Sequence, residues 1–128
     1  MRRVVLLAAV TALVALPLAA QAKAVAKAAP KTWTGEVVDA GCYMAEGARA
    51  TGEGHKECAG KCFSNGMPAG FLTSDGKLVL LVPDHKDGQA YKEALSMPGE
   101  KVELSGVAMV RNGLTAVTVT GVKRAEGK

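Results

Sequence analysis

The chain has 128 residues and a formal net charge of +4 at pH 7, from 16 basic and 12 acidic side chains. This length suffices for one domain with a modest core, and this charge indicates no special partner. With one Trp, two Tyr and two Phe, and with no continuous stripe of lysine and arginine, the composition argues against a nucleic-acid-binding surface.

The N-terminus has the pattern of a cleavable secretory signal. The basic pair Arg2-Arg3 precedes an uncharged, mostly apolar run, Val4–Leu18, and Ala20-Gln21-Ala22 matches the small-x-small pattern that signal peptidase reads. The apolar run has about fifteen residues, fewer than the roughly twenty that a membrane-spanning helix needs. We therefore expect residues 1–22 to be removed, which leaves a periplasmic or secreted protein with no stable membrane anchor.

After cleavage, the chain divides into a tether, one domain and a tail. Residues 23–31 are rich in alanine and lysine and contain Pro30, which predicts a flexible linker. Residues 32–124 have the strand and helix patterns of a domain, and residues 125–128 form a short tail.

The domain is predicted to contain five strands and two helices. The expected strands, from their β-branched and alternating apolar residues, are residues 32–39, 71–73, 77–82, 101–110 and 114–120. Asp75-Gly76 and Asn112-Gly113 supply the turn chemistry of two tight hairpins. A short helix is expected over His55–Ser64, ended by Asn65-Gly66, and another over Gln89–Met97.

This order of elements is typical of a mainly β fold, a five-stranded OB-like Greek-key barrel. In such a barrel the second helix lies between strands 3 and 4. The helix over residues 55–64, preceded by a glycine-rich loop over residues 42–54, becomes an insertion between strands 1 and 2. Gly106, inside the long fourth strand, suits the bend that a small barrel needs. The alternative is an open antiparallel sheet with one or two helices packed on a face.

All three cysteines, Cys42, Cys58 and Cys62, lie in this insertion. Exported proteins meet an oxidising compartment, where thiols tend to pair, and an odd number leaves one thiol unpaired within the chain. Because a helix turns about 100° per residue, the side chains of His55, Cys58 and Cys62 are expected to share one face within an arc of about 60°. The glycine-rich loop allows Cys42 to fold back over that face.

One interpretation of these residues is a non-enzymatic metal site. Three cysteines and one histidine form a standard closed tetrahedral shell for Zn²⁺, and the same soft ligands suit Cu⁺. Met44 or Met67 would add an accessory thioether ligand. The function would then be structural zinc or copper handling, with a metal donor or another protein of the cell envelope as partner. The four predicted ligands are Cys42, His55, Cys58 and Cys62.

Two other interpretations stay open. In the first, a disulfide joins Cys42 to Cys58 or Cys62 and stabilises a metal-free binding module, typically by about 2–4 kcal/mol. In the second, the chain is a thiol–disulfide redox protein. A thiol left free beside His55 would then have a lowered pKa, because a cationic imidazole and a helix N-terminus favour the thiolate. No other group of residues indicates a catalytic site, so we predict no catalytic residues.

A distinctive pattern extends from Gly35 to about Val119. Its parts are Gly35-Glu36-Val37-Val38-Asp39, Cys42-Tyr43-Met44, His55-x₂-Cys58-Ala59-x₂-Cys62, Gly66-x-Pro68-x-Gly70, Thr73-x-Asp75-Gly76-Lys77 and Gly99-x₂-Val102-x-Leu104-x-Gly106. In this pattern the chain resembles a group of small exported bacterial proteins without assigned function. The resemblance implies an OB-like barrel and a location in the bacterial envelope, and it implies no reaction. The paired cysteines with a histidine are also similar in chemistry to the site of copper-delivery proteins, which have a different, thioredoxin-like fold.

Overall fold

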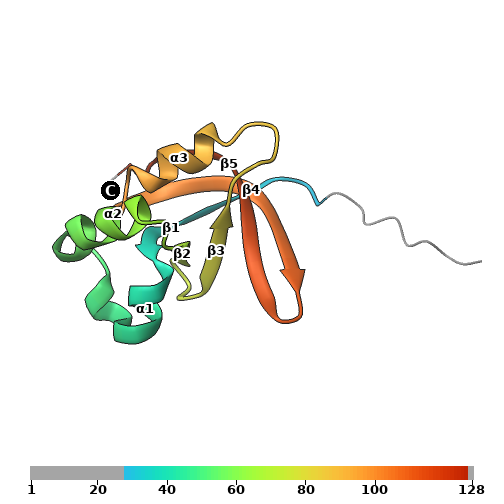
Figure 1. The fold of residues 1–128 in the computed structure, drawn as a ribbon. Coiled ribbons are helices and arrows are strands. Elements are labelled where there is room, and N and C mark those ends of the chain that lie inside the picture. The colour runs from blue at the N-terminus through green and yellow to red at the C-terminus, as the bar shows by residue number, and fades with distance from the viewer. Residues whose placement is uncertain (1–27, 127–128) are drawn as a thin grey trace, which may run out of the picture.

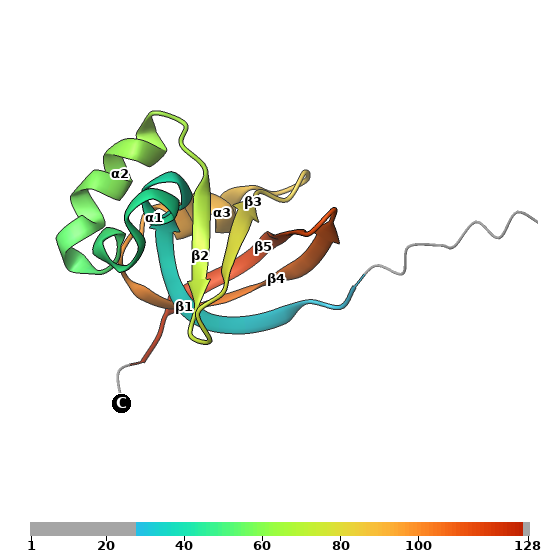
Figure 2. The same ribbon diagram turned by 90° about the horizontal axis from the view of Figure 1, so that it is seen from below.

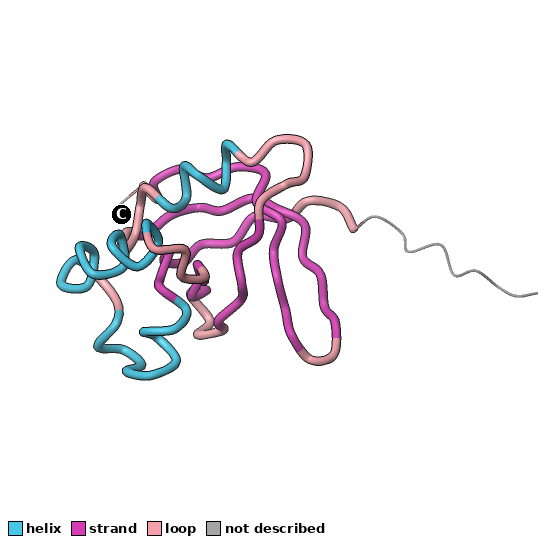
Figure 3. Tube along the Cα trace, viewed as in Figure 1, coloured by secondary structure: helices cyan, strands magenta, loops and turns pink. Residues whose placement is uncertain are grey.

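The computed structural model describes residues 28–126, which form five strands and three short α-helices. The strands are β1 (Lys31–Asp39), β2 (Ala69–Thr73), β3 (Leu78–Val82), β4 (Lys101–Arg111) and β5 (Leu114–Arg124). The helices are α1 (Ala40–Glu46), α2 (Lys56–Ser64) and α3 (Gln89–Leu95), with two 3₁₀ segments, η1 (Gly47–Ala50) and η2 (Glu53–His55), between α1 and α2. Figures 1 and 3 show the helices gathered on one side of the strands.

The strands form one sheet in the order β1-β2-β3-β5-β4. The sheet closes on itself, because β4 also pairs with β1. All neighbouring pairs are antiparallel except β3 and β5, which run parallel through the register Leu80 to Ala116. Figure 2 shows α1 and α2 together at one end of the sheet and the tip of the β4–β5 hairpin at the other. The alternative of an open antiparallel sheet is therefore wrong.

The core lies inside this closed sheet. Alternate strand residues point inward, as expected from the two-residue period of a strand, and the core residues Val37, Phe71, Val102, Leu104 and Val119 are each 0 % exposed. Ala94 and Met97, from α3 and the turn after it, complete the core. The helix predicted between strands 3 and 4 thus covers the core with the small and apolar side chains on one of its faces.

β4 is irregular at the glycine predicted to bend it. The register between β4 and β5 shifts between Ser105 and Gly106. A Cβ atom on Gly106 would lie 2.4 Å from the carbonyl oxygen of Thr118 and 2.5 Å from Val117 Cγ1. Only glycine allows the two backbones to approach this closely.

We expect Gly106→Ala to lower the free energy of unfolding by about 1–3 kcal/mol, because the added methyl group has no room against the facing strand. Urea denaturation followed by circular dichroism measures the change. Gly121→Ala is the matched control, since a Cβ atom there would meet only Ser105 Cβ, at 3.7 Å. Equal midpoints for the two variants would contradict the packing argument.

The five predicted strands and both predicted helices are present in the predicted order, but the structure adds a helix, α1, and two 3₁₀ segments that were not predicted. Residues 42–54, predicted as a loop, contain most of α1, all of η1 and the start of η2. α1 forms there because the Asp39 side chain caps its N-terminus. The helix predicted from His55 begins one residue later, at Lys56, and Lys31, predicted as the last linker residue, already belongs to β1.

The predicted signal sequence, residues 1–22 with cleavage after Ala22, lies outside the described residues, as does linker segment 23–27. Within residues 28–126, none of the helices has the length and apolar character needed to cross a bilayer. The described chain begins with three residues of irregular structure and continues directly into β1.

Candidate metal centre

The three cysteines come together in space. The Sγ atoms of Cys42, Cys58 and Cys62 all lie within 4.8 Å of one another. A tetrahedral zinc ion with Zn–S bonds of about 2.3 Å requires sulfur atoms about 3.8 Å apart. The cluster therefore has to contract by at most about 1 Å to hold such an ion. All the cysteines of the chain take part, as the sequence predicted.

The packing of α2 on the barrel explains the direction of two of these thiols. Ala59 is buried, and Phe63, one turn later, packs against the core. Cys58 and Cys62 each precede one of these residues, so they form a neighbouring stripe with the same spacing of four residues. Packing of the Ala59 and Phe63 side chains therefore leaves both thiols on one side of α2.

Asp39 and the loop after α2 bring the third thiol to this stripe. The Asp39 side chain is the N-cap of α1, and its Oδ1 atom accepts a hydrogen bond of 2.7 Å from the backbone N–H of Cys42. The backbone N–H of Ala40 donates to the carbonyl oxygen of Pro68 at 3.0 Å. Since Pro68 lies in the loop that leaves α2, this bond links the start of α1 to the end of α2.

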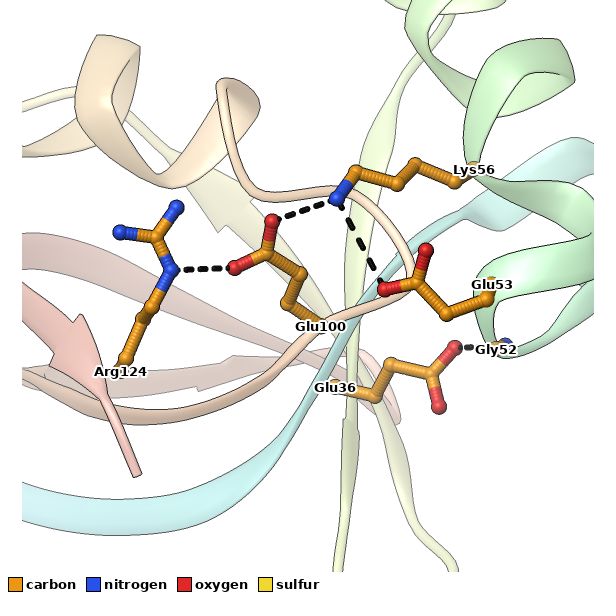
Figure 4. A network of polar contacts seen from close by, with 6 residues as sticks. All are labelled: Glu36, Gly52, Glu53, Lys56, Glu100 and Arg124. Atoms are coloured by element: carbon orange, nitrogen blue, oxygen red, sulfur yellow. Dashed lines mark hydrogen bonds and ion pairs between the residues drawn. The ribbon is translucent and has the colours of Figure 1, made fainter. Parts of the chain in front are cut away.

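A polar network ties the other end of α2 to the barrel (Figure 4). Lys56 Nζ lies 2.7 Å from one carboxylate oxygen of Glu100, and Arg124 Nε lies 2.7 Å from the other. These hydrogen bonds from Arg124 and Lys56 lower the pKa of the Glu100 carboxyl. The backbone N–H of Gly52 donates to the Glu36 side chain on β1. The segment that carries Cys58 and Cys62 is thus anchored to β1, β5 and the turn before β4.

The structure leaves His55 outside the group formed by the three cysteines. His55 ends η2 and is the N-cap of α2, with φ −107° and ψ −3°. Cys58 and Cys62 lie within the regular turns of α2, whereas His55 precedes them in a 3₁₀ turn. His55 Nε2 is buried, without a hydrogen-bond partner among the described residues. A role for His55 as ligand stays a prediction.

The two methionines predicted as accessory ligands differ in position. The Met44 side chain is 76 % exposed and lies at the surface. Met67 follows α2, and its backbone N–H donates to the carbonyl oxygen of Cys62 at 3.0 Å. Its Cε atom is near Gly41, where an added Cβ would meet it at 3.3 Å. Met44 on α1 is thus largely exposed to solvent, whereas the Met67 side chain lies against Gly41 of the same helix.

Asp39 is the residue that the sequence analysis missed. It is 0 % exposed, and its Oδ2 atom makes no hydrogen bond of standard geometry among the described residues. The only signal in the sequence is an aspartate three residues before Cys42, the spacing of a helix N-cap and the third helical residue. That signal becomes visible once α1 is known to begin at Ala40.

The Asp39 carboxylate changes the acidity of two thiols. Hydrogen bonding to this carboxylate, together with burial and its negative charge, raises the pKa of Cys62 to about 12. Burial, followed by the charge of Asp39, raises the pKa of Cys42. The redox interpretation requires a lowered thiol pKa, so these shifts, in the opposite direction, argue against nucleophilic catalysis by Cys42 or Cys62.

All three cysteines are free thiols in the structure. Their proximity suits a shared metal ion, and it also places Cys42 near both Cys58 and Cys62, the two candidates for a disulfide. The decisive experiment must therefore distinguish a metal-bound chain from an oxidised one.

Comparison of the chain with protein-family models, with curated proteins and with solved structures found no match. What the protein does is therefore inferred from the chemistry of its own residues. The resemblance to small exported bacterial proteins stays a prediction from the sequence.

Proposed function

We propose that the cluster of Cys42, Cys58 and Cys62 binds one thiophilic metal ion, Zn²⁺ or Cu⁺, and that the protein has no catalytic activity. The observation that carries this proposal is the mutual distance of at most 4.8 Å between three Sγ atoms from two different helices. Three thiolates provide most of a tetrahedral zinc shell and all of a three-sulfur Cu⁺ site.

The helices α1 and α2 each have only one buried side chain, which supports a structural effect of the metal. Ala40 is the buried residue of α1, and Ala59 is the buried residue of α2. Helices this short gain little stability by themselves, so they depend on tertiary contacts. A metal bound to Cys42 on α1 and to both cysteines on α2 would join the two helices, and the binding free energy would stabilise the folded insertion.

The exposure of the cluster supports exchange of the ion with other molecules. Cys58 is exposed, while Cys42 and Cys62 are half-buried. A metal donor or acceptor protein could therefore reach one sulfur while the other two still hold the ion. This arrangement fits metal handling in the cell envelope, with a protein partner that presents its own soft ligands.

We also propose export of the protein and an OB-type fold for the barrel. The basic, apolar and small-x-small segments before residue 23 support export. The strand order β1-β2-β3-β5-β4, the parallel pairing of β3 with β5, and a helix between β3 and β4 support the OB-type fold.

Native mass spectrometry of the protein as the cell exports it, purified without chelator, tests the metal proposal. We expect one zinc or copper ion per chain, or uptake of one ion when Zn²⁺ or Cu⁺ is offered anaerobically to the reduced protein. The control is the variant with Cys42, Cys58 and Cys62 all replaced by serine, whose fold is checked by circular dichroism. A chain that lacks two hydrogens when purified, and takes up neither ion after reduction, would refute metal binding and support the disulfide-stabilised module.

A further inference from the structure

The Asp39 carboxylate has a second oxygen that takes no part in the cap of α1. The side chain is fully buried, and Oδ1 is used by the cap of α1, whereas Oδ2 has no hydrogen bond of standard geometry. A buried carboxylate oxygen whose neighbouring donors among the described residues are only the weakly donating thiols of Cys42 and Cys62 is costly unless a cation compensates it. A ligand is therefore expected at this oxygen.

No side-chain cation compensates this carboxylate in the described part of the chain. The ion pairs there involve other acidic residues, namely Glu53, Glu57, Asp75, Glu100 and Glu103. The groups beside Asp39 are instead the thiols of Cys42 and Cys62, whose acidity it changes. The buried carboxylate thus borders the proposed metal site, where a bound cation would compensate its charge.

We infer that Asp39 Oδ2 is the fourth ligand of the metal bound by Cys42, Cys58 and Cys62, and that this oxygen makes the site select Zn²⁺ over Cu⁺. The inference rests on the proposed metal-binding function. Zn²⁺ takes four ligands in a tetrahedron and accepts carboxylate oxygen at about 2.0–2.2 Å. Cu⁺ is softer and carries one charge less, so three sulfurs satisfy it and an oxygen adds little.

The geometry also indicates which side chain moves when the ion binds. Asp39 lies on the Cys42 and Cys62 side of the cluster and is not within 4.8 Å of all three Sγ atoms. Cys58 is the exposed cysteine, so its side chain has the most freedom to rotate toward the ion. Oδ1 keeps its bond to the Cys42 backbone, which fixes the carboxylate in place while Oδ2 binds the metal.

Asp39→Asn tests this inference while preserving the cap. Asparagine and aspartate are equally good N-caps. The amide oxygen of the introduced asparagine can still accept the hydrogen bond from the Cys42 backbone N–H, and its NH₂ group takes the place of Oδ2. We expect the Zn²⁺ affinity, measured by competition with a chromophoric chelator, to fall by more than ~10-fold. Removal of an outer-shell partner alone typically costs ~10–100-fold. Affinity for Cu⁺ should change by less than about tenfold, because its three sulfur ligands remain.

Two further variants make the result decisive. The serine of Asp39→Ser can also cap the helix but has no second oxygen, so this variant should lose Zn²⁺ affinity as Asp39→Asn does. Thermal unfolding checks that each metal-free variant is folded.

His55→Gln should keep its Zn²⁺ affinity. A large loss in this variant with none in Asp39→Asn would assign the fourth position to His55 and overturn the inference. Unchanged Zn²⁺ affinity in both Asp39 variants would overturn the inference and leave the three-cysteine site intact. An unaltered chain that binds neither ion would instead refute the proposed function itself.

Discussion

Cys62→Ser should remove metal binding under conditions in which the unaltered chain binds one ion. Cys62 is within 4.8 Å of both other thiols and is held on α2 by the neighbouring Phe63, which packs against the core. A serine hydroxyl is a poor ligand for a soft metal. We expect the affinity for Zn²⁺ and for Cu⁺ to fall by more than about 100-fold, the upper end of the losses caused by outer-shell changes. Chelator competition and native mass spectrometry measure it.

The stability of the same protein provides a second measurement. A ligand that binds only the folded state raises the midpoint of thermal unfolding, so excess Zn²⁺ should stabilise the unaltered chain and leave Cys62→Ser unchanged. Met44→Leu is the matched control, because it removes a sulfur atom from a side chain that is 76 % exposed, and it should behave like the unaltered chain. Equal metal affinity in Cys62→Ser and the unaltered chain would show that the cluster is not the binding site.

Local turn chemistry made the order of the elements predictable. The backbone at Gly76, Asn112 and Gly113 has positive φ angles of 83°, 50° and 81°, as the Asp-Gly and Asn-Gly pairs indicated. These turns fix two hairpins without reference to the rest of the chain. Closure of the sheet is different, because the parallel pairing of Leu80 with Ala116 joins residues that are far apart in sequence. The barrel could be suggested from the order of the elements, but its pairing could not be derived.

The site was predictable to the extent that one regular element carries it. Cys58 and Cys62 lie four residues apart on α2, so the helical period places them on one side. His55 precedes this helix in a 3₁₀ turn, and the structure leaves it outside the group of three cysteines. Helix ends are set by local caps and tertiary contacts, and the prediction extended the helix by one residue into this turn.

Asp39 shows why part of the site could not be found from the sequence. Its two functions, capping α1 and facing the thiols, both depend on a helix of seven residues that has only one buried side chain. Such a helix has no apolar period to detect, and its existence depends on the cap and on the bond between Ala40 and Pro68. The carboxylate that changes the chemistry of Cys42 and Cys62 was therefore predicted only as the end of a strand.

Zn²⁺ affinity should fall steeply as the pH is lowered. The Asp39 carboxylate and burial hold the pKa values of Cys62 and Cys42 above that of an ordinary thiol, so both are protonated at neutral pH. A metal ion binds thiolates, so binding must release at least these two protons. Each released proton contributes about tenfold per pH unit, which predicts a loss of at least ~100-fold per unit below neutral pH. Chelator competition between about pH 6 and 8, together with calorimetry in buffers of different ionisation enthalpy, measures the slope and the proton count.

The folding stability of the metal-free chain should fall as the pH is raised, whereas its Zn²⁺ affinity falls as the pH is lowered. The pKa of the Cys62 thiol is higher in the folded state than the value of about 8.5 expected in the unfolded state. The resulting contribution to stability is fully present below about pH 8.5 and is lost as the pH rises toward the folded-state pKa. Stability of the metal-free protein should thus decline above about pH 8.5, whereas the zinc-loaded protein, whose thiols are already ionised, should not share this decline. The triple-serine variant should lack both effects. In the calorimetric measurement of zinc binding, release of fewer than two protons per zinc ion would contradict binding through Cys42 and Cys62.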